Sequence, residues 1–268
     1  MRALVAGKVG EPADVLRLES RPVPTPKAGQ ALIRVKATPI HASDLHVLRG
    51  RYGFSPEFPK LDVQPGEWLL QTAAGSTVGR LVIQLSRHLG IRTINVVRRR
   101  AAVEEIKALG GDEVICTEDE DLLQRVAEIA GPTGVHKATD CVAGDLGAQV
   151  SQALAPGGEV VVYGALSTHR QTDPAALTIP LQARSVIYET KTVRGFWLNR
   201  WFGTASPEDA LRALSQVRGL VADGVLSIPQ GQPFPLERFT EAISLAEAPA
   251  HGTKPLFVFE DGGGKDNR

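Results

Sequence analysis

The sequence predicts an α/β fold in which a doubly wound parallel sheet forms most of the chain and an incomplete β domain forms the rest. From residue 62 onward, short apolar runs alternate with helical patterns, as expected of strands joined by crossover helices. Before residue 62, short runs alternate polar and apolar residues between prolines, which favours antiparallel β structure. At 73–79, a tight turn of small residues leads from a strand-like run into a helix.

The composition is that of a globular chain without a strong charge bias. Of its 268 residues 43% are hydrophobic, and 30 lysines and arginines balance 30 aspartates and glutamates, so nothing points to nucleic-acid binding. No apolar run approaches the roughly 20 residues of a membrane span. The strand expected at Met1–Val5 leaves no room for a leader peptide. We therefore expect a cytoplasmic protein with neither nucleic-acid nor membrane partners.

Residues 1–61 are expected to form antiparallel strands, one of them over the alternating run Ala31–Val35. A short helix is expected at 40–50, where Gly50 ends the pattern. An exposed loop follows at Arg51–Gly53.

From residue 62 the predicted elements alternate regularly between strand and helix. The strands are expected at 68–72, 93–97, 113–116, 136–141, 159–163 and 190–197, and the helices at 77–89, 101–109, 118–130 and 144–154. This order requires a parallel doubly wound sheet. Cys116 and Cys141 lie in strand-like segments and lack C-x-x-C spacing, so two buried thiols are expected.

The carboxyl-terminal part continues with helices and one strand. Ser206 is a predicted N-cap, and Pro207 at the first helical position opens a helix to about Ala222. A last amphipathic helix is expected at 236–246 and a last strand at 255–259. The predicted domains are a cofactor-binding domain at 62–227, a catalytic β domain at 1–61 and 228–260, and a disordered tail at 261–268.

The turn at 73–79 is the first candidate binding site. It holds only two of the glycines of the G-x-G-x-x-G pattern. The first turn of the following helix nevertheless offers backbone N–H groups and the positive end of a dipole, and small residues allow a pyrophosphate to come close. The candidate contacts are Gly75, Ser76, Thr77, Val78 and Gly79.

Three arginines after the second parallel strand are the second candidate site. Arg98 lies 19 residues beyond Gly79 and is followed by Arg99 and Arg100. In dinucleotide-binding sites, the residue that contacts the adenosine ribose lies about 20 residues beyond the glycine turn. It is an acid where the cofactor is NAD, and an arginine nearby binds the 2′-phosphate where the cofactor is NADP. Since no acid occupies this position and a guanidinium binds a phosphate through two N–H groups, the pattern predicts NADPH. The alternative is a solvated basic run.

The chain resembles the medium-chain dehydrogenase/reductase superfamily, in which a GroES-like β domain is joined to a Rossmann domain. The resemblance is carried by the turn at 73–79, the run 89–98 and the segment Arg194–Leu198. These match the mitochondrial-type trans-2-enoyl-thioester reductases, which use NADPH to reduce the 2,3 double bond of an enoyl-CoA or enoyl-acyl-carrier protein. The resemblance implies that activity, those two partners, a homodimer, and the mitochondrial matrix as the compartment in a eukaryote.

The resemblance also assigns roles to residues outside the two sites above. It implies that Tyr52 is the proton donor and that further cofactor contacts lie at Tyr163, Gly164, Ala165, Leu166, Phe196, Trp197, Leu198 and Lys254. Without the resemblance, Phe196 and Trp197 would be interpreted as core aromatics and Lys254 as a surface charge. Their expected place at the carboxyl ends of strands favours ligand binding.

A zinc site is the alternative to this assignment. Zinc alcohol dehydrogenases of the superfamily use cysteine and histidine ligands, whereas His41, Asp44 and His46 have no cysteine nearby in the sequence. We interpret Asp44 as a residue that caps or pins the short helix, and we expect no metal.

The resemblance breaks between Leu61 and Asp62, where relatives continue through further GroES-like strands and a helix. Part of the β domain and of the active-site wall is therefore expected to be missing. This leaves three functions open: an impaired enoyl-thioester reductase, an NADPH:quinone oxidoreductase, and an NADPH-binding protein with weak catalysis. The homodimer is expected to form through the strand near Thr190–Phe196, which is β-prone and free of proline.

Overall fold

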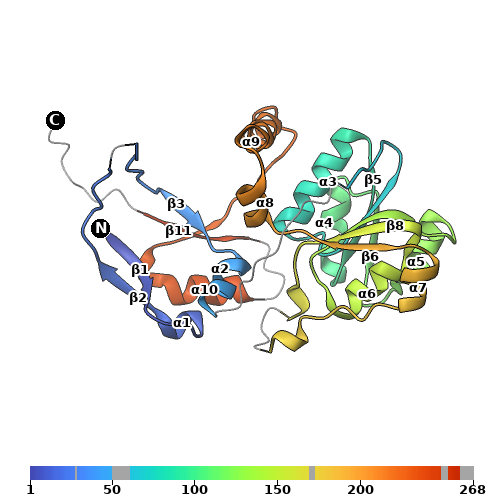
Figure 1. Ribbon diagram of the computed structural model, residues 1–268, viewed down its shortest axis with the longest axis horizontal. Coiled ribbons are helices and arrows are strands. Elements are labelled where there is room, and N and C mark those ends of the chain that lie inside the picture. Colours follow the sequence, from blue (N-terminus) through green and yellow to red (C-terminus); the bar gives the residue numbers. More distant parts are fainter. Residues whose placement is uncertain (28, 50–60, 169–172, 249–252, 260–268) are drawn as a thin grey trace. The chain divides into compact units, whose positions relative to one another are not determined.

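The computed structural model of the chain describes residues 1–27, 29–49, 61–168, 173–248 and 253–259. The chain divides into two compact units, Met1–Gly53 with Pro229–Arg268, and Phe54–Ile228. Figure 1 shows both units with their elements labelled. Each unit is described by itself below.

The larger unit is built on a six-stranded sheet in the order β6-β5-β4-β7-β8-β9. Its strands are β4 Trp68–Gln71, β5 Arg92–Val97, β6 Glu113–Cys116, β7 Val135–Asp140, β8 Leu154–Val162 and β9 Thr192–Gly195. All neighbouring strands run parallel, which confirms the predicted Rossmann sheet. The chain builds outward from β4 to β6 and then returns to the other side of β4 with β7, so the order reverses between β4 and β7.

The helices of this unit follow the predicted alternation. They are α3 Thr77–Leu89, α4 Val103–Ala108, α5 Leu122–Ala130, α6 Gly144–Gln152, α7 Ala183–Tyr188, α8 Leu198–Thr204 and α9 Pro207–Ala222, with 3-10 turns at Arg100–Ala102, Leu166–Thr168 and Pro174–Ala176. Ser206 accepts the Asp209 amide as the predicted cap of α9. Within the described ranges, no helix is both long and apolar enough to cross a membrane.

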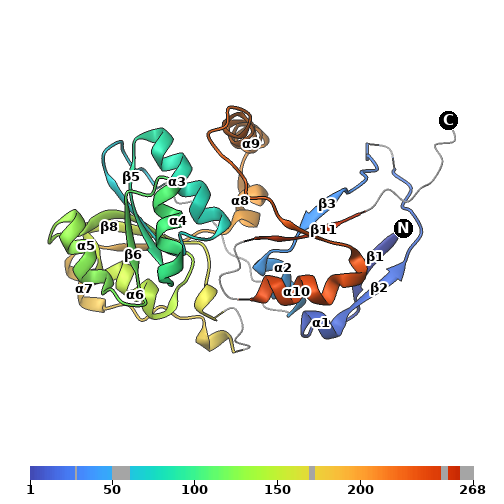
Figure 2. The same ribbon diagram turned by 180° about the vertical axis from the view of Figure 1, so that it is seen from behind.

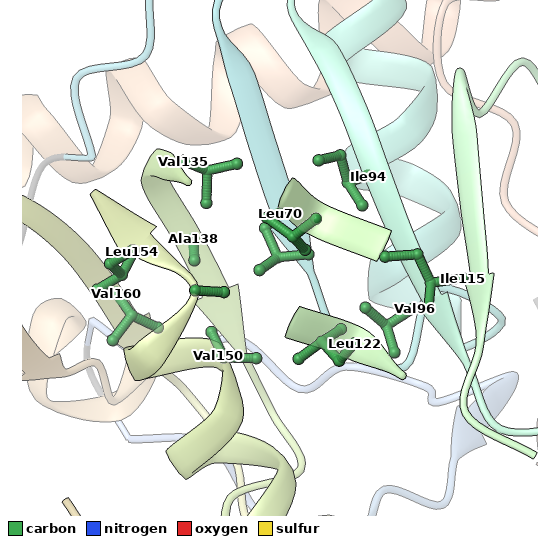
Figure 3. Close-up of a cluster of buried hydrophobic side chains, with 12 residues drawn as sticks. Leu70, Ile94, Val96, Ile115, Leu122, Val135, Ala138, Val150, Leu154 and Val160 are labelled. Carbon is green, nitrogen blue, oxygen red and sulfur yellow. The ribbon is translucent and has the colours of Figure 1, made fainter. Parts of the chain in front are cut away.

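Buried side chains cover both faces of the sheet. On one face, Leu70, Ile94 and Val96 pack against Leu122 of α5 and Val150 of α6 in the cluster shown in Figure 3. On the other face, a second cluster joins strand residues to side chains of α3 and α4. Figure 2 shows this layered arrangement from behind. Burial of each leucine or isoleucine side chain contributes roughly 1.5–3 kcal/mol to the free energy of unfolding. The two clusters therefore hold the strands, and with them their carboxyl ends, in a fixed geometry.

The smaller unit contains two short sheets. The strands β1 Arg2–Ala6 and β2 Leu16–Ser20 form an antiparallel pair, and β10 Gln232–Phe234, β11 Pro255–Val258 and β3 Ala37–Pro39 form the second sheet. Its helices are α1 Pro12–Val15, α2 Ala42–Leu48 and α10 Phe239–Glu247, with a 3-10 turn at Leu236–Arg238. A small core between these elements includes Leu45, Phe234 and Ile243.

The strand predicted at Ala31–Val35 is wrong. Residues 31–36 form no regular structure, and the Ile33 side chain is 79% exposed. An alternating run becomes a strand only where a neighbouring strand supplies hydrogen-bond partners and a core face. Among the described residues no strand pairs with this segment. The pattern predicted a strand that the shortened β domain does not complete.

The role predicted for Asp44 is confirmed. Its Oδ2 accepts the backbone amide of His41, the N-cap of α2, at 2.7 Å. A carboxylate in the first turn also favours the positive end of the helix dipole. Asp44 therefore fixes the start of α2.

Candidate functional site

The turn after β4 forms a capped helix start. Ala73 has a φ of 50°, and the Ser76 amide donates to the Ala73 carbonyl at 2.8 Å, which closes the turn. Ser76 Oγ then accepts the Gly79 amide at 3.1 Å as the N-cap of α3. The amides of Thr77 and Val78 belong to the first helical turn, which has no intrahelical acceptors. These donors are suited to an anion.

The two glycines of this turn have different functions. A Cβ on Gly79 would lie 2.7 Å from the Ala73 carbonyl oxygen and from Ala74 Cα, so glycine is required where α3 packs against the turn. A Cβ on Gly75 would meet nothing within 4 Å, which leaves space beside the backbone. Arg80 braces the turn, since its Nε donates to the Gly75 carbonyl at 3.1 Å. A pyrophosphate fits this geometry.

A buried polar pair joins β4 to β7 where the strand order reverses. Thr72 and Asp140 are both fully buried, and Thr72 Oγ1 donates to Asp140 Oδ1 at 2.6 Å. The amides of Val142 and Ala143 donate to the same carboxylate at 2.9 and 3.0 Å. The Asp140 charge is thereby satisfied by three donors. This pair fixes the carboxyl ends of β4 and β7 beside the turn at 73–79, where ligands of open α/β sheets bind.

The three arginines follow β5 directly. Arg98 and Arg99 are exposed, and among the residues that the structure describes neither guanidinium forms an ion pair or a hydrogen bond. Arg100 has a different environment: its guanidinium pairs with Asp119 and lies 3.8 Å from Glu120. No acid occupies this position in the sequence after β5, but carboxylates from the segment that follows β6 lie beside Arg100.

The segment after β8 lies at the carboxyl ends of the strands, like the turn and the arginines. The Tyr163 amide donates to the Asp140 carbonyl at 2.8 Å, and the Leu166 amide donates to the Cys141 carbonyl at 2.9 Å. Gly164 lies so close that a Cβ there would be 3.0 Å from the Cys141 carbonyl oxygen. Burial, followed by the adjacent Cys141, raises the pKa of the Tyr163 hydroxyl well above its usual value. The segment Tyr163–Leu166 is therefore fixed at the carboxyl end of the sheet.

The segment after β9 also reaches this edge. The Phe196 amide donates to the Val162 carbonyl at 2.7 Å, which places Phe196 beside the end of β8. Trp197 is the N-cap of α8, and Leu198 is its first residue with a side chain 51% exposed. The structure thus brings the turn, the arginines and both later segments to the carboxyl ends of parallel strands.

The two remaining predicted residues lie elsewhere. Lys254 belongs to the smaller unit and precedes β11, and burial lowers its pKa while Asp44 opposes that shift. Tyr52, the predicted proton donor, lies outside the described residues.

Thr72 and Asp140 were not expected from the sequence as structural residues of the site. Each is a polar residue at or near the carboxyl end of a predicted strand, but both strands hold other polar residues, so this signal is not specific. The acidic run Glu118–Glu120 was not expected beside the arginines either. Only the pairing of β5 with β6, which sets Val97 beside Cys116, brings this run next to the arginines.

Comparison with known proteins gives matches over nearly the whole chain. The family model described as zinc-binding dehydrogenase matches residues 77–216. The mitochondrial enoyl-[acyl-carrier-protein] reductase of Rattus norvegicus is 24% identical over 339 residues, covering 96% of this chain and 88% of the rat protein. The Caenorhabditis elegans protein of the same name is 34% identical over 205 residues, covering 75% of this chain and 56% of its own length.

The crystal structure of a putative NADPH:quinone reductase from Bacillus thuringiensis has the same fold. Its TM-score is 0.86 at 20% identity, and the match covers 97% of this chain and 99% of that one. In the rat comparison, 339 aligned positions against 268 residues leave at least 71 positions of the relative without a counterpart here. That difference agrees with the predicted missing segment.

The described residues do not fit a zinc site. Within the ranges that the structure describes, no three histidine, cysteine, aspartate or glutamate side chains come together as a ligand set. Both cysteines are buried in the larger unit, whereas His41 and His46 belong to the smaller one. Catalytic zinc sites of proteins need three such ligands.

Proposed function

This chain belongs to the zinc-binding dehydrogenase family of the medium-chain dehydrogenase/reductase superfamily and is an oxidoreductase of the NAD(P)-binding type, and from this membership we propose its reaction. It reduces the 2,3 double bond of trans-2-enoyl thioesters with NADPH. The observation that carries this proposal is the match to a mitochondrial enoyl-[acyl-carrier-protein] reductase over 96% of the chain. Enoyl-CoA and enoyl-acyl-carrier protein are the proposed substrates.

The geometry of the larger unit supports the cofactor. The turn at 73–79 would hold the pyrophosphate, and the exposed Arg98 and Arg99 offer guanidinium groups for a 2′-phosphate. The segments Tyr163–Leu166 and Phe196–Leu198 lie at the same sheet edge. They are the proposed contacts along the rest of the dinucleotide. Lys254 is proposed as one further contact from the smaller unit.

The proposed chemistry needs one proton donor from the protein. When bound, NADPH would supply a hydride to Cβ of the substrate, and negative charge would then develop on the thioester carbonyl oxygen and Cα. Tyr52 is proposed to deliver the proton to Cα, and donors in the site must stabilise the oxyanion. A phenol is suitable for this step because it is neutral at physiological pH.

An activity assay separates the proposal from its nearest enzyme alternative. Crotonyl-CoA should support NADPH oxidation, and Tyr52→Phe should lower kcat by roughly 10²–10⁴-fold, the range of a general acid. NADPH affinity should be unchanged in this variant. Unchanged kcat in Tyr52→Phe would remove Tyr52 from the mechanism.

NADPH:quinone reduction is the second candidate function. The observation that favours it is the likeness to the Bacillus thuringiensis structure over 97% of the chain. Such a reaction does not need Tyr52. Turnover of a quinone at equal rates by the wild type and by Tyr52→Phe, without turnover of crotonyl-CoA, would establish this alternative.

Cofactor binding with weak catalysis is the third candidate. It is favoured by the small sheets of the smaller unit and by the positions that this chain lacks relative to the rat protein. Catalytic groups need placement within about half an ångström, so a reduced supporting structure should affect rate more than affinity. Insertion of a relative's segment between Leu61 and Asp62 should then raise kcat while the NADPH affinity stays the same.

We also propose a homodimer formed through β9. This strand is the edge of the six-stranded sheet. An unpaired edge offers hydrogen-bonding groups that a second copy can use. A monomer in sedimentation at micromolar concentration would contradict it.

A further inference from the structure

We propose that Asp119 withholds Arg100 from the cofactor, so that Arg98 and Arg99 read the 2′-phosphate and Asp119 limits the preference for NADPH over NADH. This inference rests on the proposed function, because it assigns separate tasks within the proposed cofactor site.

The first observation is the set of contacts that Arg100 makes. Its guanidinium pairs with the Asp119 carboxylate, and its backbone amide donates to Glu118 Oε2 at 3.1 Å. Glu120 lies 3.8 Å from the same guanidinium. Three consecutive carboxylates thus face the third arginine. The pKa of Asp119 is lowered chiefly by its hydrogen bond with Arg100.

The second observation is that the acids and the arginines follow neighbouring strands. The last paired residues of β5 and β6 are Val97 and Cys116, and the Thr117 amide donates to the Val97 carbonyl at 3.0 Å. Arg98 and the acidic run therefore both begin at the same corner of the sheet. A side chain that binds the 2′-phosphate at the carboxyl ends of β5 and β6 is therefore exposed to the negative potential of these carboxylates.

The third observation separates Arg100 from its two neighbours. Arg98 and Arg99 are exposed, and in the described ranges their guanidinium groups form no ion pair or hydrogen bond. They can bind a phosphate without giving up an existing contact. Arg100 must first release Asp119, and this release would leave an unpaired carboxylate close to the phosphate.

The charges decide the direction of the effect. A 2′-phosphate carries up to two negative charges, and the screening length at physiological salt is about 8 Å, so carboxylates at this corner repel it. NADH lacks that phosphate and is affected little. The acidic run therefore lowers the affinity for NADPH selectively, and Asp119 contributes most because it also keeps the Arg100 guanidinium away from the phosphate.

The test compares two single-charge variants. Asp119→Asn frees Arg100, whereas Glu118→Gln removes an equal charge from a side chain that accepts the Arg100 backbone amide and, among the described residues, does not pair with the guanidinium. Dissociation constants for NADPH and NADH are measured by nucleotide fluorescence titration. Asp119→Asn should tighten NADPH binding roughly three- to tenfold, with NADH changed less than about twofold, and Glu118→Gln should produce a clearly smaller effect. Equal effects of the two variants would overturn the inference, because bulk charge alone would explain them.

Arginine variants complete the experiment. Arg98→Ala should weaken NADPH binding about tenfold or more, and Arg100→Ala should weaken it less than about threefold in the wild-type background. In the Asp119→Asn background Arg100→Ala should become as costly as Arg98→Ala. Equal losses for both arginines in the wild type would contradict the inference. Equal wild-type affinity for NADPH and NADH, unaltered by Arg98→Ala, would instead contradict the proposed cofactor preference itself.

Discussion

Replacing Thr72 by valine should destabilise the larger unit without changing its shape. Valine matches threonine in shape but lacks the hydroxyl that donates to Asp140 at 2.6 Å and accepts the Cys141 amide at 3.0 Å. Loss of a hydrogen bond to a buried charge costs about 1.5–3 kcal/mol, and a buried amide without an acceptor costs about 1–3 kcal/mol. The expected loss is about 3–5 kcal/mol, a large part of the roughly 5–15 kcal/mol that stabilises a typical protein.

Urea unfolding followed by tryptophan fluorescence measures this loss. Trp68, Trp197 and Trp201 are the three tryptophans of the chain, and all lie in the larger unit, so the signal reports that unit. Thr72→Ser is the matched control, since it keeps the hydroxyl and should cost about 1 kcal/mol for the lost methyl group. A Thr72→Val protein within about 0.5 kcal/mol of Thr72→Ser would refute the role assigned to the buried pair.

Three further predictions concern other parts of the chain. Ser76→Ala should cost about 1 kcal/mol of stability through loss of the α3 cap, and NADPH binding by fluorescence titration should weaken in parallel; unchanged stability would contradict the cap. Burial raises the pKa of the Cys141 thiol above its ordinary 9.0. The contribution of this neutral thiol to the free energy of unfolding is therefore fully present below pH 9 and decreases at higher pH, where the thiol of the unfolded chain ionises first. Native protein should therefore resist thiol labelling at pH 8, and rapid labelling of Cys141 would contradict this. Arg49→Met should lower the stability of the smaller unit by about 2 kcal/mol, since the Arg49 side chain is only 6% exposed and pairs with two carboxylates; a free energy of unfolding within about 0.5 kcal/mol of the wild type, measured by circular dichroism in urea, would contradict this role.

The Rossmann part of the fold could be predicted because its signals are local. The strands β4, β5 and β6 are short, mostly apolar runs, and α3 has a serine cap, an amphipathic body and a terminal glycine. The order reversal beside β4 follows from the usual rules for parallel sheets. These features do not depend on contacts between distant residues.

The features that could not be predicted depend on such contacts. The run Ala31–Val35 has the pattern of a strand, but a strand also needs a neighbour, and the sequence does not state which neighbours are present. Likewise, Arg98 and Arg100 look equivalent in the sequence. Only the pairing of β5 with β6 places Asp119 against Arg100 and makes the two arginines different.

Deuterium transfer tests the central claim most directly. The protein is incubated with crotonyl-CoA and NADPH deuterated at C4 of the nicotinamide, each deuterium epimer in turn, and the acyl product is examined by mass spectrometry and NMR. We predict a saturated butyryl thioester that carries one deuterium at Cβ with one of the two epimers, at a rate that is strongly reduced in Tyr52→Phe. Oxidation of the cofactor without deuterium at Cβ, or no saturated product with either epimer, would contradict the proposal that this chain is an enoyl-thioester reductase.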